Sequence, residues 1–542
     1  MRFLIHAPNR AALTVATALA AALLPLVSVF PVGAVMADAR NAASTADTSM
    51  RENASTANYG GATIIGADGD EPRGSGKDIS YSGTTTAAPT NADKPNIFAH
   101  WHHSTQRGVG GANTVAAYEA EIRKAKAMGI EGFAYNVINV DLELPEINNL
   151  YTAAHNVGGF YLFPSADQCC GMSEASLDRL AFDHYYDPAR LRVDGGRFGN
   201  NLPVMQTWHG EAKGTAEWRR IQNEWKNAGK PMFFLPYFAP SRYGGVEQDF
   251  SVWDGADPNS QNDDVVDGLY NFDGIASGNN SEHARQENHA YDVAAGARPG
   301  MDAMFSCTPV FNRHSGTDSV ANRIIGDHEG FHAWRNCHEG LVADKPRFIE
   351  YTTWNDYLEG SYLGGSYTNS QLPPPYRGNN LSHDAFRKLS EYYLKWYDTG
   401  TQPTVTRDLI AIAHRLHPEN AAGVNANGAG IADDTDRAQS DSGATKPLRR
   451  QYDYSVVEDR LYAAVMLKQA GTVTLKSGST QRSFSLPAGV SEVSMPFAAG
   501  SQSASLARGG QTLLAATSPS QVQSGAVSLF NYNVQTAFAQ RP

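Results

Sequence analysis

The chain has 542 residues, 41% of them hydrophobic and 10% aromatic, and a single core stops growing near roughly 250 to 300 residues, so two or more domains are expected. Lys and Arg total 44 against 56 for Asp and Glu, a formal net charge of -12, and the lack of a basic block excludes nucleic acid as a partner. The 50 Gly and 27 Pro, beside 24 Tyr, 22 Phe and 8 Trp, favour turns and aromatic-lined clefts, which suit a neutral, ring-shaped ligand.

The N-terminal segment has the features of an export signal. Arg2, His6 and Arg10 precede an apolar stretch from Ala11 to Ala37, and small residues near its end offer a peptidase site. We expect 1-37 to be a signal peptide of a protein that is secreted, extracellular or periplasmic. The stretch exceeds the usual apolar region of roughly 7 to 15 residues, so an uncleaved N-terminal anchor is the alternative.

Residues 38-93 are rich in Ala, Ser, Thr, Gly, Asn and Asp, with too few large apolar side chains to offset the entropy of ordering. They are predicted to form a disordered, low-complexity tether. Of the four cysteines, Cys169 and Cys170 are adjacent and do not easily bond to each other. A bridge is expected to join one of them to Cys307 or Cys337, and the sequence does not choose the pairing.

Short apolar runs rich in aromatic and branched residues recur between residues 94 and 400, each followed by a loop and a helical pattern. Eight strands with intervening helices match a (β/α)8 TIM barrel, which needs roughly 250 residues. The alternative, a doubly wound open sheet, lacks a G-x-G-x-x-G after the first strand. The predicted strands are Ile97 to Trp101, Gly132 to Val137, Phe160 to Ala166, Leu202 to Thr207, Met232 to Phe238, Val265 to Tyr270, Ala303 to Val310 and Arg347 to Thr353.

Helices are placed by caps and by apolar periodicity. Asn113 opens a segment whose apolar residues share one face, and Gly129 closes it. The other predicted helices are Leu144 to Asn156, Glu174 to Tyr185, Thr215 to Ala228, Glu282 to Ala294, Asn322 to Asn336 and His383 to Tyr397.

Reactive residues in such barrels come from the carboxyl ends of the strands and the loops just beyond them. These positions carry carboxylates, amides and imidazoles with aromatic residues between them, as a sugar site does. No cofactor or metal is needed. The candidate substrate-binding residues are Asp267, Asp167, Glu211, His209, Asn355, Trp354, His100, Trp101, Asn136 and Tyr237; further polar residues there are His102, His103, Asn139, Asp141, Asn271, Asp273, Asn312 and His314.

Asp356 and Glu359 follow the eighth predicted strand, three residues apart. Glycosidic bonds need one carboxyl group to protonate the leaving oxygen and a second to activate water or attack the sugar. Two acids in a surface loop are most often merely solvated, but the position of this pair, just outside a barrel strand, makes it the predicted catalytic pair.

The string His328-Glu329-Gly330-Phe331-His332 satisfies the H-E-x-x-H pattern of zinc proteases. Gly330 weakens a helix there, and no further Glu or His ligand is evident downstream. The segment also falls where an outer helix of the barrel is expected, so zinc proteolysis is the weaker hypothesis.

The string from Phe348 to Glu359, F-I-E-Y-T-T-W-N-D-Y-L-E, resembles the T-W-N-D-Y-G-E-S signature of glycoside hydrolase family 71, the α-1,3-glucanases or mutanases. Other pieces agree in order: Phe98 to His100 with F-A-H, Gly129 to Asn136 with G-I-D-G-F-A-L-N, Val266 to Tyr270 with V-D-G-x-F-S-W, and His414 to Pro418 with Y-R-P-H-P. The resemblance covers about Asn96 to Phe530. It implies an inverting endo-hydrolase of α-1,3-glucan, with the paired acids at Asp356 and Glu359.

Three departures from that pattern bear on linkage and subsite specificity more than on the chemistry. Leu358 stands where the family has Gly, Gly360 precedes Ser361, and Asn271-Phe272 replace Ser-Trp.

Beyond the barrel, 401-446 is expected to be a connecting segment and linker, most polar from Asp434 to Lys446. Short alternating runs in 447-542 predict a C-terminal β-sandwich domain, similar to the β domain that accompanies the family's barrel. The runs are Leu461 to Leu467, Gly471 to Leu475, Arg482 to Leu486, Val490 to Met495, Ala504 to Ala507, Thr512 to Ala516 and Val527 to Tyr532.

The sequence therefore predicts a secreted glycoside hydrolase that cleaves α-glucan, with a polysaccharide as its substrate partner, no nucleic acid, no membrane beyond an N-terminal anchor, and a monomeric state. Two alternatives use the same features. One is a non-catalytic glycan-binding surface protein that keeps the barrel as a scaffold, and the other is an α-mannoside-cleaving barrel enzyme.

Overall fold

The computed structural model describes residues 58-59, 62-63, 96-103, 113-168, 171-238, 265-272, 283-296, 300-313, 323-326, 329-357, 359-364, 381-418, 458-524 and 533-541. The chain divides into two compact units, 1-54 and 55-542, and every described residue belongs to the second. The predicted signal peptide and the polar linker Asp434 to Lys446 lie outside the described residues. In the predicted tether, the described pieces are two short paired strands, β1 (Asn58–Tyr59) and β2 (Ala62–Thr63).

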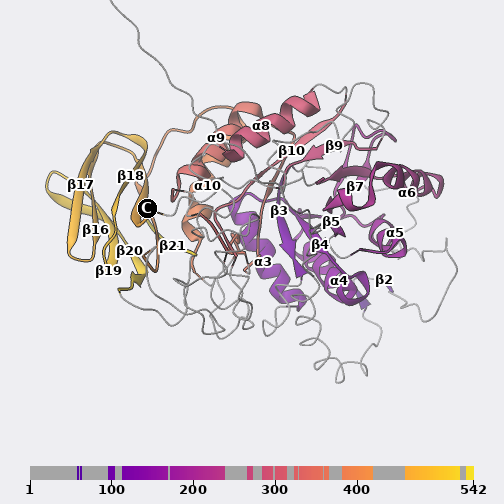
Figure 1. The fold of residues 1–542 in the computed structure, drawn as a ribbon, viewed down its shortest axis with the longest axis horizontal. Coiled ribbons are helices and arrows are strands. Elements are labelled where there is room, and N and C mark those ends of the chain that lie inside the picture. The colour runs from indigo at the N-terminus through magenta and orange to yellow at the C-terminus, as the bar shows by residue number, and fades with distance from the viewer. Residues whose placement is uncertain are drawn as a thin grey trace, which may run out of the picture. The chain divides into compact units, whose positions relative to one another are not determined.

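In the described part of the chain, one curled sheet contains eight parallel strands (Figure 1) and a short antiparallel strand, β6 (Arg192–Val193), which pairs with β7. The parallel strands are β3 (Ile97–His102), β4 (Gly132–Val137), β5 (Tyr161–Asp167), β7 (Leu202–Trp208), β8 (Phe233–Pro236), β9 (Gly268–Tyr270), β10 (Asp302–Cys307) and β13 (Phe348–Tyr351). β13 returns to pair with β3 through Ile349 and Ile97. Asp267 N, just before β9, donates to Phe234 O in β8 at 2.8 Å. The fold is mixed α/β, with a sheet compatible with a TIM-like barrel.

Side chains alternate between two environments along these strands, because successive residues of a strand point to opposite faces. On β3, Ile97, Ala99 and Trp101 belong to the large core that also contains helix residues. Phe98 instead packs with Phe163 and Phe348 inside the curled sheet. The polar residues His100 and His102 continue the inner face that Phe98 begins, so β3 carries histidines toward its carboxyl end on the inside of the sheet.

Helices cover the outer face of the sheet. They are α3 (Val115–Met128), α4 (Val140–Val157), α5 (Glu174–Phe182), α6 (Thr215–Asn227), α8 (His283–Gly296), α9 (His332–Asp344) and α10 (Asp384–Thr399). The first begins one residue later than predicted, because the Thr114 hydroxyl, not Asn113, accepts the capping bond from Ala117 N. As predicted, Gly129 closes α3: it is the C-cap after Met128 and adopts a left-handed conformation with φ 100°.

The helix predicted from Asn322 to Asn336 is wrong. Its first part is a strand, β12 (Arg323–Gly326), which pairs antiparallel with β11 (Phe311–Arg313). Glu329 and Gly330 then adopt positive φ values of 52° and 68°, a conformation that no helix continues through. The helix therefore starts only at His332.

The C-terminal region forms two four-stranded antiparallel sheets, of order β18-β15-β14-β21 and β17-β16-β19-β20. Side chains of both sheets, including Ile410, Leu461 and Leu475, share one buried core. The strands are β14 (Leu409–Arg415), β15 (Arg460–Leu467), β16 (Gly471–Ser477), β17 (Thr480–Leu486), β18 (Gly489–Pro496), β19 (Gly500–Arg508), β20 (Gln511–Val522) and β21 (Val534–Gln540).

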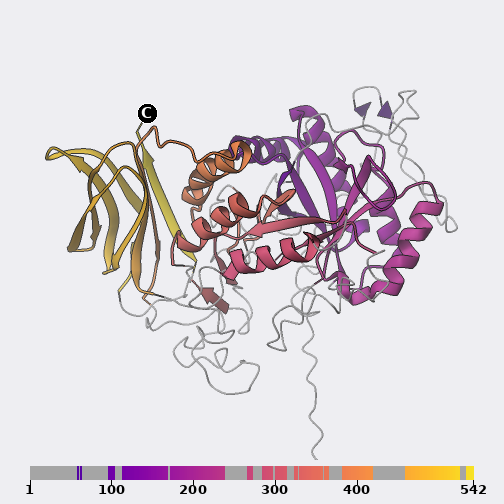
Figure 2. The same cartoon turned by 90° about the horizontal axis from the view of Figure 1, so that it is seen from above.

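Two details of this region differ from the sequence prediction. β14 was expected to be part of a connecting segment, yet it is a fully buried strand between β15 and β21. The predicted strand Val527 to Tyr532 lies outside the described residues, and β21 follows it. In Figure 2 this last yellow strand lies beside the orange helix α10. The Thr536 hydroxyl donates to Ser382 O and accepts from Ala385 N, which joins the strand to the start of the helix.

A disulfide joins Cys307, the last residue of β10, to Cys337 in α9. The prediction that a bridge would use Cys169 or Cys170 is therefore corrected for these two residues. The packing of α9 against β10 brings the Cα atoms of Cys307 and Cys337 to a distance of 6.0 Å, which is within the range that a disulfide needs. Among the described residues, no helix is both long and apolar enough to cross a membrane.

Candidate active site

The predicted acid pair lies in the loop that follows β13. Trp354 N donates to His100 O at 2.7 Å, so the chain stays paired to β3 for three residues beyond β13. Asp356 N then donates to the Thr353 hydroxyl at 2.8 Å, and Glu359 N donates to Asp356 Oδ1 at 3.1 Å. Asp356 retains 8% of its surface exposed, and Glu359 is partly exposed. Both acids thus belong to one tight turn at the carboxyl ends of the strands.

His102 is the imidazole beside this pair. Its Nε2 lies 3.7 Å from Asp356 Oδ2. Asn355 fixes the backbone between them, since its side chain accepts from His102 N at 2.7 Å and donates to His102 O at 2.9 Å. Burial lowers the pKa of His102 well below its usual value, and the neighbouring His100 and His103 lower it further. The ring next to Asp356 is therefore neutral at pH 7.

Three fully buried polar side chains, those of Glu350, His100 and Gln206, are joined inside the sheet. Glu350, in the middle of β13, contacts His100 Nδ1 at 2.7 Å through one oxygen and accepts from Gln206 Nε2 at 2.6 Å through the other. All three side chains are completely shielded from solvent. The His100 ring meets the rings of His102 and Phe272, each with a centroid distance of 5.0 Å.

Sequence reasoning missed Glu350, although a signal was present. It is a carboxylate in the middle of an otherwise apolar strand, and such a group is buried only with partners. Its partners come from β3 and β7, which lie far away in the sequence, so the pattern of β13 alone did not disclose them.

Neighbouring strand ends add further predicted residues. Asn136 in β4 donates to Asp167 Oδ2 at the end of β5, at 3.4 Å. Asp167 is opposite Trp208 in the parallel register. His209 has a positive φ of 53° and stacks edge-on against Trp208, with ring centroids 3.8 Å apart. These side chains share the carboxyl-end edge of the sheet with His102.

Tyr237 lies just beyond β8 and is fully buried. It contacts Tyr270 and Phe272, with ring centroids 6.1 and 5.7 Å apart. It belongs to the inner aromatic cluster, below Phe272, which is itself partly exposed.

Two predicted sugar-binding tryptophans point elsewhere. Trp101 is buried among Tyr118 and Phe133 on the outer side of the sheet. Trp354 is also fully buried there, and its indole nitrogen donates to Glu121 in α3 at 3.0 Å. Strand alternation explains the correction for Trp101, which lies between the inward-facing His100 and His102 on β3. Trp354 lies beyond the end of β13, and its bond to Glu121 holds it on the outer side.

Asp267 is a structural acid rather than a site residue. It precedes β9, at the amino ends of the strands, opposite the acid pair. Its carboxylate accepts from Arg197 N at 2.6 Å, from Arg197 Nε at 3.0 Å and from Phe234 N at 2.7 Å. An ion pair and a backbone bond to β8 thus occupy both of its oxygens.

The remaining candidates fall into two groups, those outside the described residues and those that contact helices. The side chains of Glu211 and Asn312, and the whole of Asp273 and His314, lie outside the described residues. Asn139 caps α4 by accepting from Asp141 N and Leu142 N. Asn271 donates to Asn288 in α8 at 2.9 Å, so it faces the helices.

The zinc-protease hypothesis is wrong for the residues it needs. Glu329 and Gly330 form a turn, α9 starts at His332, and the His332 ring contacts Glu492 at 2.8 Å. The five residues therefore do not share one helix, and His328 lies outside the described residues. Within the described chain, the one group spaced for a cation is His289, Asp292 and Asp344, none of which is a predicted site residue.

A curled parallel sheet with carboxylates, amides and a neutral imidazole at its carboxyl ends is the arrangement that a glycoside hydrolase uses. The comparisons agree with this class. The family model of glycosyl hydrolase family 71 matches residues 93–541. The chain therefore belongs to that family and is a glycoside hydrolase.

Curated relatives include the glucan endo-1,3-alpha-glucosidase agn1 of Schizosaccharomyces pombe, which is 26% identical over 82% of this chain and 95% of its own length. A mutanase of Penicillium rubens is 29% identical over 36% of this chain and 40% of its own length. The ascus wall endo-1,3-alpha-glucanase of Schizosaccharomyces pombe is 23% identical over 64% of this chain and 71% of its own length.

Proposed function

We propose that this chain is a secreted endo-α-1,3-glucanase that cleaves its polysaccharide with inversion. The observation that carries the proposal is the turn that holds Asp356 and Glu359 together at the carboxyl end of β13, with neutral His102 3.7 Å from Asp356. The names of the relatives add the substrate, since two act on 1,3-alpha-glucan and one is a mutanase.

In this proposal Glu359 protonates the leaving oxygen, and Asp356 removes a proton from the attacking water. Inversion needs room for that water, with the two carboxyl groups roughly 6.5 to 9.5 Å apart. A neutral His102 places no positive charge beside Asp356. The basicity of the Asp356 carboxylate is therefore not lowered by this neighbour, and Asp356 can act as the base. Asn136, Asp167, His209 and His100 would bind sugar hydroxyls.

The finer architecture is part of the same proposal. The return of β13 to β3, and the bond between Asp267 N and Phe234 O, support a (β/α)8 barrel. The core shared by the two C-terminal sheets supports a β-sandwich. The protein would act outside the cytoplasm as a monomer, without metal or cofactor.

The test is hydrolysis by the full chain and by Asp356→Asn and Glu359→Gln. Each variant should lower kcat on α-1,3-glucan by about 10²- to 10⁴-fold, the usual contribution of a positioned acid or base. Asp141→Asn is the matched control, because Asp141 is an exposed acid after β4 that pairs with Arg179. Its kcat should stay within about twofold.

A panel of α-1,3-glucan, dextran, starch and α-mannan, with the product anomer followed by NMR, tests substrate and stereochemistry. Release of reducing ends from α-mannan alone would indicate a mannoside-cleaving enzyme. Binding without any reducing ends would indicate a glycan-binding protein. Full turnover by both acid variants would overturn the assignment of the pair.

A further inference from the structure

The loop that carries the proposed acids is a closed structure of its own. Two stretches form its stem, 353-354 on one side and 361-364 on the other. Thr353 N donates to Ser361 O at 2.8 Å, Leu363 N to Thr353 O at 2.9 Å, and Gly364 N to Trp354 O at 2.6 Å. Asp356 and Glu359 lie between these stretches, so any movement of the stem moves both acids.

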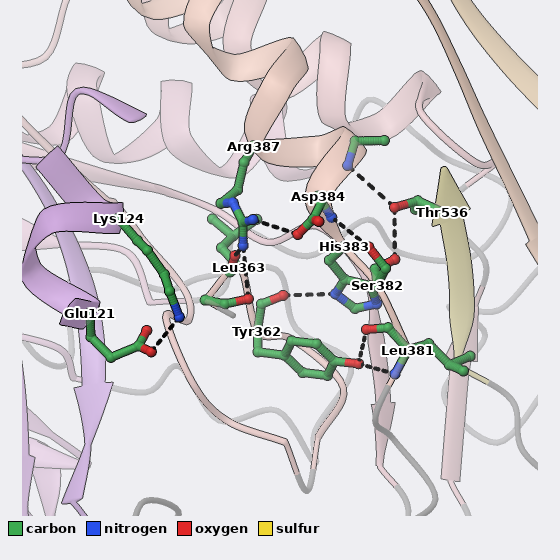
Figure 3. Close-up of polar contacts among 12 residues, drawn as sticks. Glu121, Lys124, Tyr362, Leu363, Leu381, Ser382, His383, Asp384, Arg387 and Thr536 are labelled. Atoms are coloured by element: carbon green, nitrogen blue, oxygen red, sulfur yellow. Dashed lines mark hydrogen bonds and ion pairs between the residues drawn. The ribbon is translucent and has the colours of Figure 1, made fainter. Parts of the chain in front are cut away.

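α10 holds the returning stretch, 361-364. Arg387 Nη1 donates to Leu363 O at 2.5 Å and to Gly364 O at 2.9 Å, and Arg387 Nη2 donates to Asp384 (Figure 3). These contacts fix Leu363 and Gly364, the residues that end the loop.

Tyr362, in the middle of the returning stretch, is the central contact. Its ring stacks on His383 with centroids 4.2 Å apart and an interplanar angle of 6°. His383 Nδ1 contacts Tyr362 O at 2.7 Å. The Tyr362 hydroxyl donates to Leu381 O at 2.5 Å and accepts from Leu381 N at 2.6 Å (Figure 3). Tyr362 and His383 are both fully buried.

The last support comes from the C-terminal sheet. Asn533 immediately precedes β21 and is completely buried. Its Nδ2 donates to the Tyr362 hydroxyl at 3.1 Å, and its Oδ1 lies 3.1 Å from His383 Nε2. The same oxygen accepts from Val534 N at 2.8 Å, which ties the side chain to the start of β21.

We propose that Asn533 is a positioning residue for the hydrolytic reaction, which acts through Tyr362 and His383 to hold the loop of Asp356 and Glu359. The C-terminal sheet then braces the catalytic loop and is part of the working enzyme. β13 ends at Tyr351, and beyond that point the stem contacts the sheet through the bond from Trp354 N to His100 O. The returning stretch is held by Arg387 and by Asn533. This inference rests on the proposed function, because it concerns the position of the same acids.

Asn533→Ala in the full chain tests the proposal, with kcat and KM measured on α-1,3-glucan well below the unfolding temperature of each variant. A displacement of about 1 Å at reacting groups costs up to about 10²-fold in rate. We expect kcat to fall at least about tenfold, or about 1.4 kcal/mol, with KM within about twofold. Tyr362→Phe keeps the stacked ring but loses the hydroxyl, and should lower kcat in the same direction by a smaller factor.

Thr536→Val is the matched control. Thr536 lies in β21, three residues after Asn533. Its hydroxyl donates to Ser382 O at 2.7 Å and accepts from Ala385 N at 3.3 Å, so it joins β21 to the start of α10 without touching the loop. We expect a lower unfolding temperature with kcat within about twofold. If Thr536→Val loses as much kcat as Asn533→Ala, the support is merely structural and the proposal fails.

The remaining outcomes are also distinct. If Asn533→Ala does not fold, Tyr362→Phe decides, and a kcat within about 20% of the parent value would overturn the brace. If Asn533→Ala retains its kcat while Asp356→Asn is inactive, the brace fails and the proposed function stands. If Asp356→Asn and Glu359→Gln are as active as the parent, the proposed function fails, and the brace fails with it.

Discussion

Glu350 shows how much of the site depends on a single buried side chain. Its two oxygens face His100 and Gln206, and none of the three side chains is exposed. A buried carboxylate is tolerated only where charge and hydrogen-bond partners compensate for the loss of water. The contact to Nδ1 also fixes the orientation of the His100 ring, whose Nε2 has no hydrogen-bond partner among the described residues.

We expect Glu350→Ala to lower the free energy of unfolding by about 3 to 5 kcal/mol, since it leaves His100 and Gln206 buried without their shared partner. Glu350→Gln keeps the volume, and should cost less stability while still lowering kcat, because the side chain no longer offers an acceptor oxygen to both His100 Nδ1 and Gln206 Nε2. Urea titration and initial rates measure the two effects.

Met304 in β10 is fully buried, and its sulfur lies 3.4 Å from Gln206 Nε2. Met304→Leu is therefore a control that changes an apolar neighbour of the same network, and should cost less than about 1.5 kcal/mol with activity retained. A Glu350→Gln variant with parental kcat would contradict a role for His100 in the site.

Some residue assignments were accessible from sequence, and others were not. Trp101 lies between His100 and His102 on a strand, so the period of two already places it on the opposite face. Trp354 could not be placed in the same way, because it lies beyond the last residue of β13. The role of Asp267 depends on Arg197, 70 residues earlier, and no local pattern predicts that contact.

The elements follow local sequence where apolar runs and caps are clear. β4 begins and ends at the predicted residues, and the predicted Gly129 closes α3. The error at 322 to 336 arose because the predicted helix ran across Glu329 and Gly330, whose positive φ values turn the backbone. β14 was missed because its apolar run lies in a segment that was assigned to a connection.

The disulfide between β10 and α9 gives a prediction for the stability of these elements. It closes a loop with a sequence separation of 30 residues, for which chain entropy in the unfolded state corresponds to about 3 to 4 kcal/mol. We expect the double variant Cys307→Ala with Cys337→Ala to lose about this much free energy of unfolding. Its urea midpoint should move to a lower concentration. Hydrolysis at 25 °C should persist, because both residues lie in the core between the sheet and the helices.

Reduction of the parent protein by a thiol is the parallel experiment, and it should give the same shift. An unchanged midpoint in the double variant would show that the bridge adds no stability.

At the scale of the whole molecule, two buried histidines predict how stability depends on pH. His338 in α9 contacts Trp334 O and the Tyr351 hydroxyl, and His414 in β14 contacts Arg415 O and the Ser518 hydroxyl. Each neutral ring can donate from Nδ1 and accept at Nε2. Burial lowers the pKa of each from its usual value near 6.5 to about 4.

A histidine whose folded pKa is lowered takes up its proton first in the unfolded chain. Stability should therefore be highest above pH 6.5 and fall as the pH drops toward 4, by up to about 2 kcal/mol per histidine at pH 5. Urea titrations between pH 7 and 4.5 measure this slope. His414→Gln should flatten it by removing one titrating group, and an unaltered slope would contradict the assignment.

The sequence by itself determined the alternation of the eight parallel strands with helices, the family, and the position of Asp356 and Glu359 just after a strand. These features are encoded by neighbours in the chain, through alternation, periodicity and motif. Only the tertiary structure decided which partners meet: Glu350 with His100 and Gln206, Cys307 with Cys337, Asp267 with Arg197, and Tyr362 with Asn533. Each of these contacts joins residues that are far apart in the sequence, so local backbone preferences do not bring them together. Their distance is set by how the sheet curls and by where the C-terminal strands return.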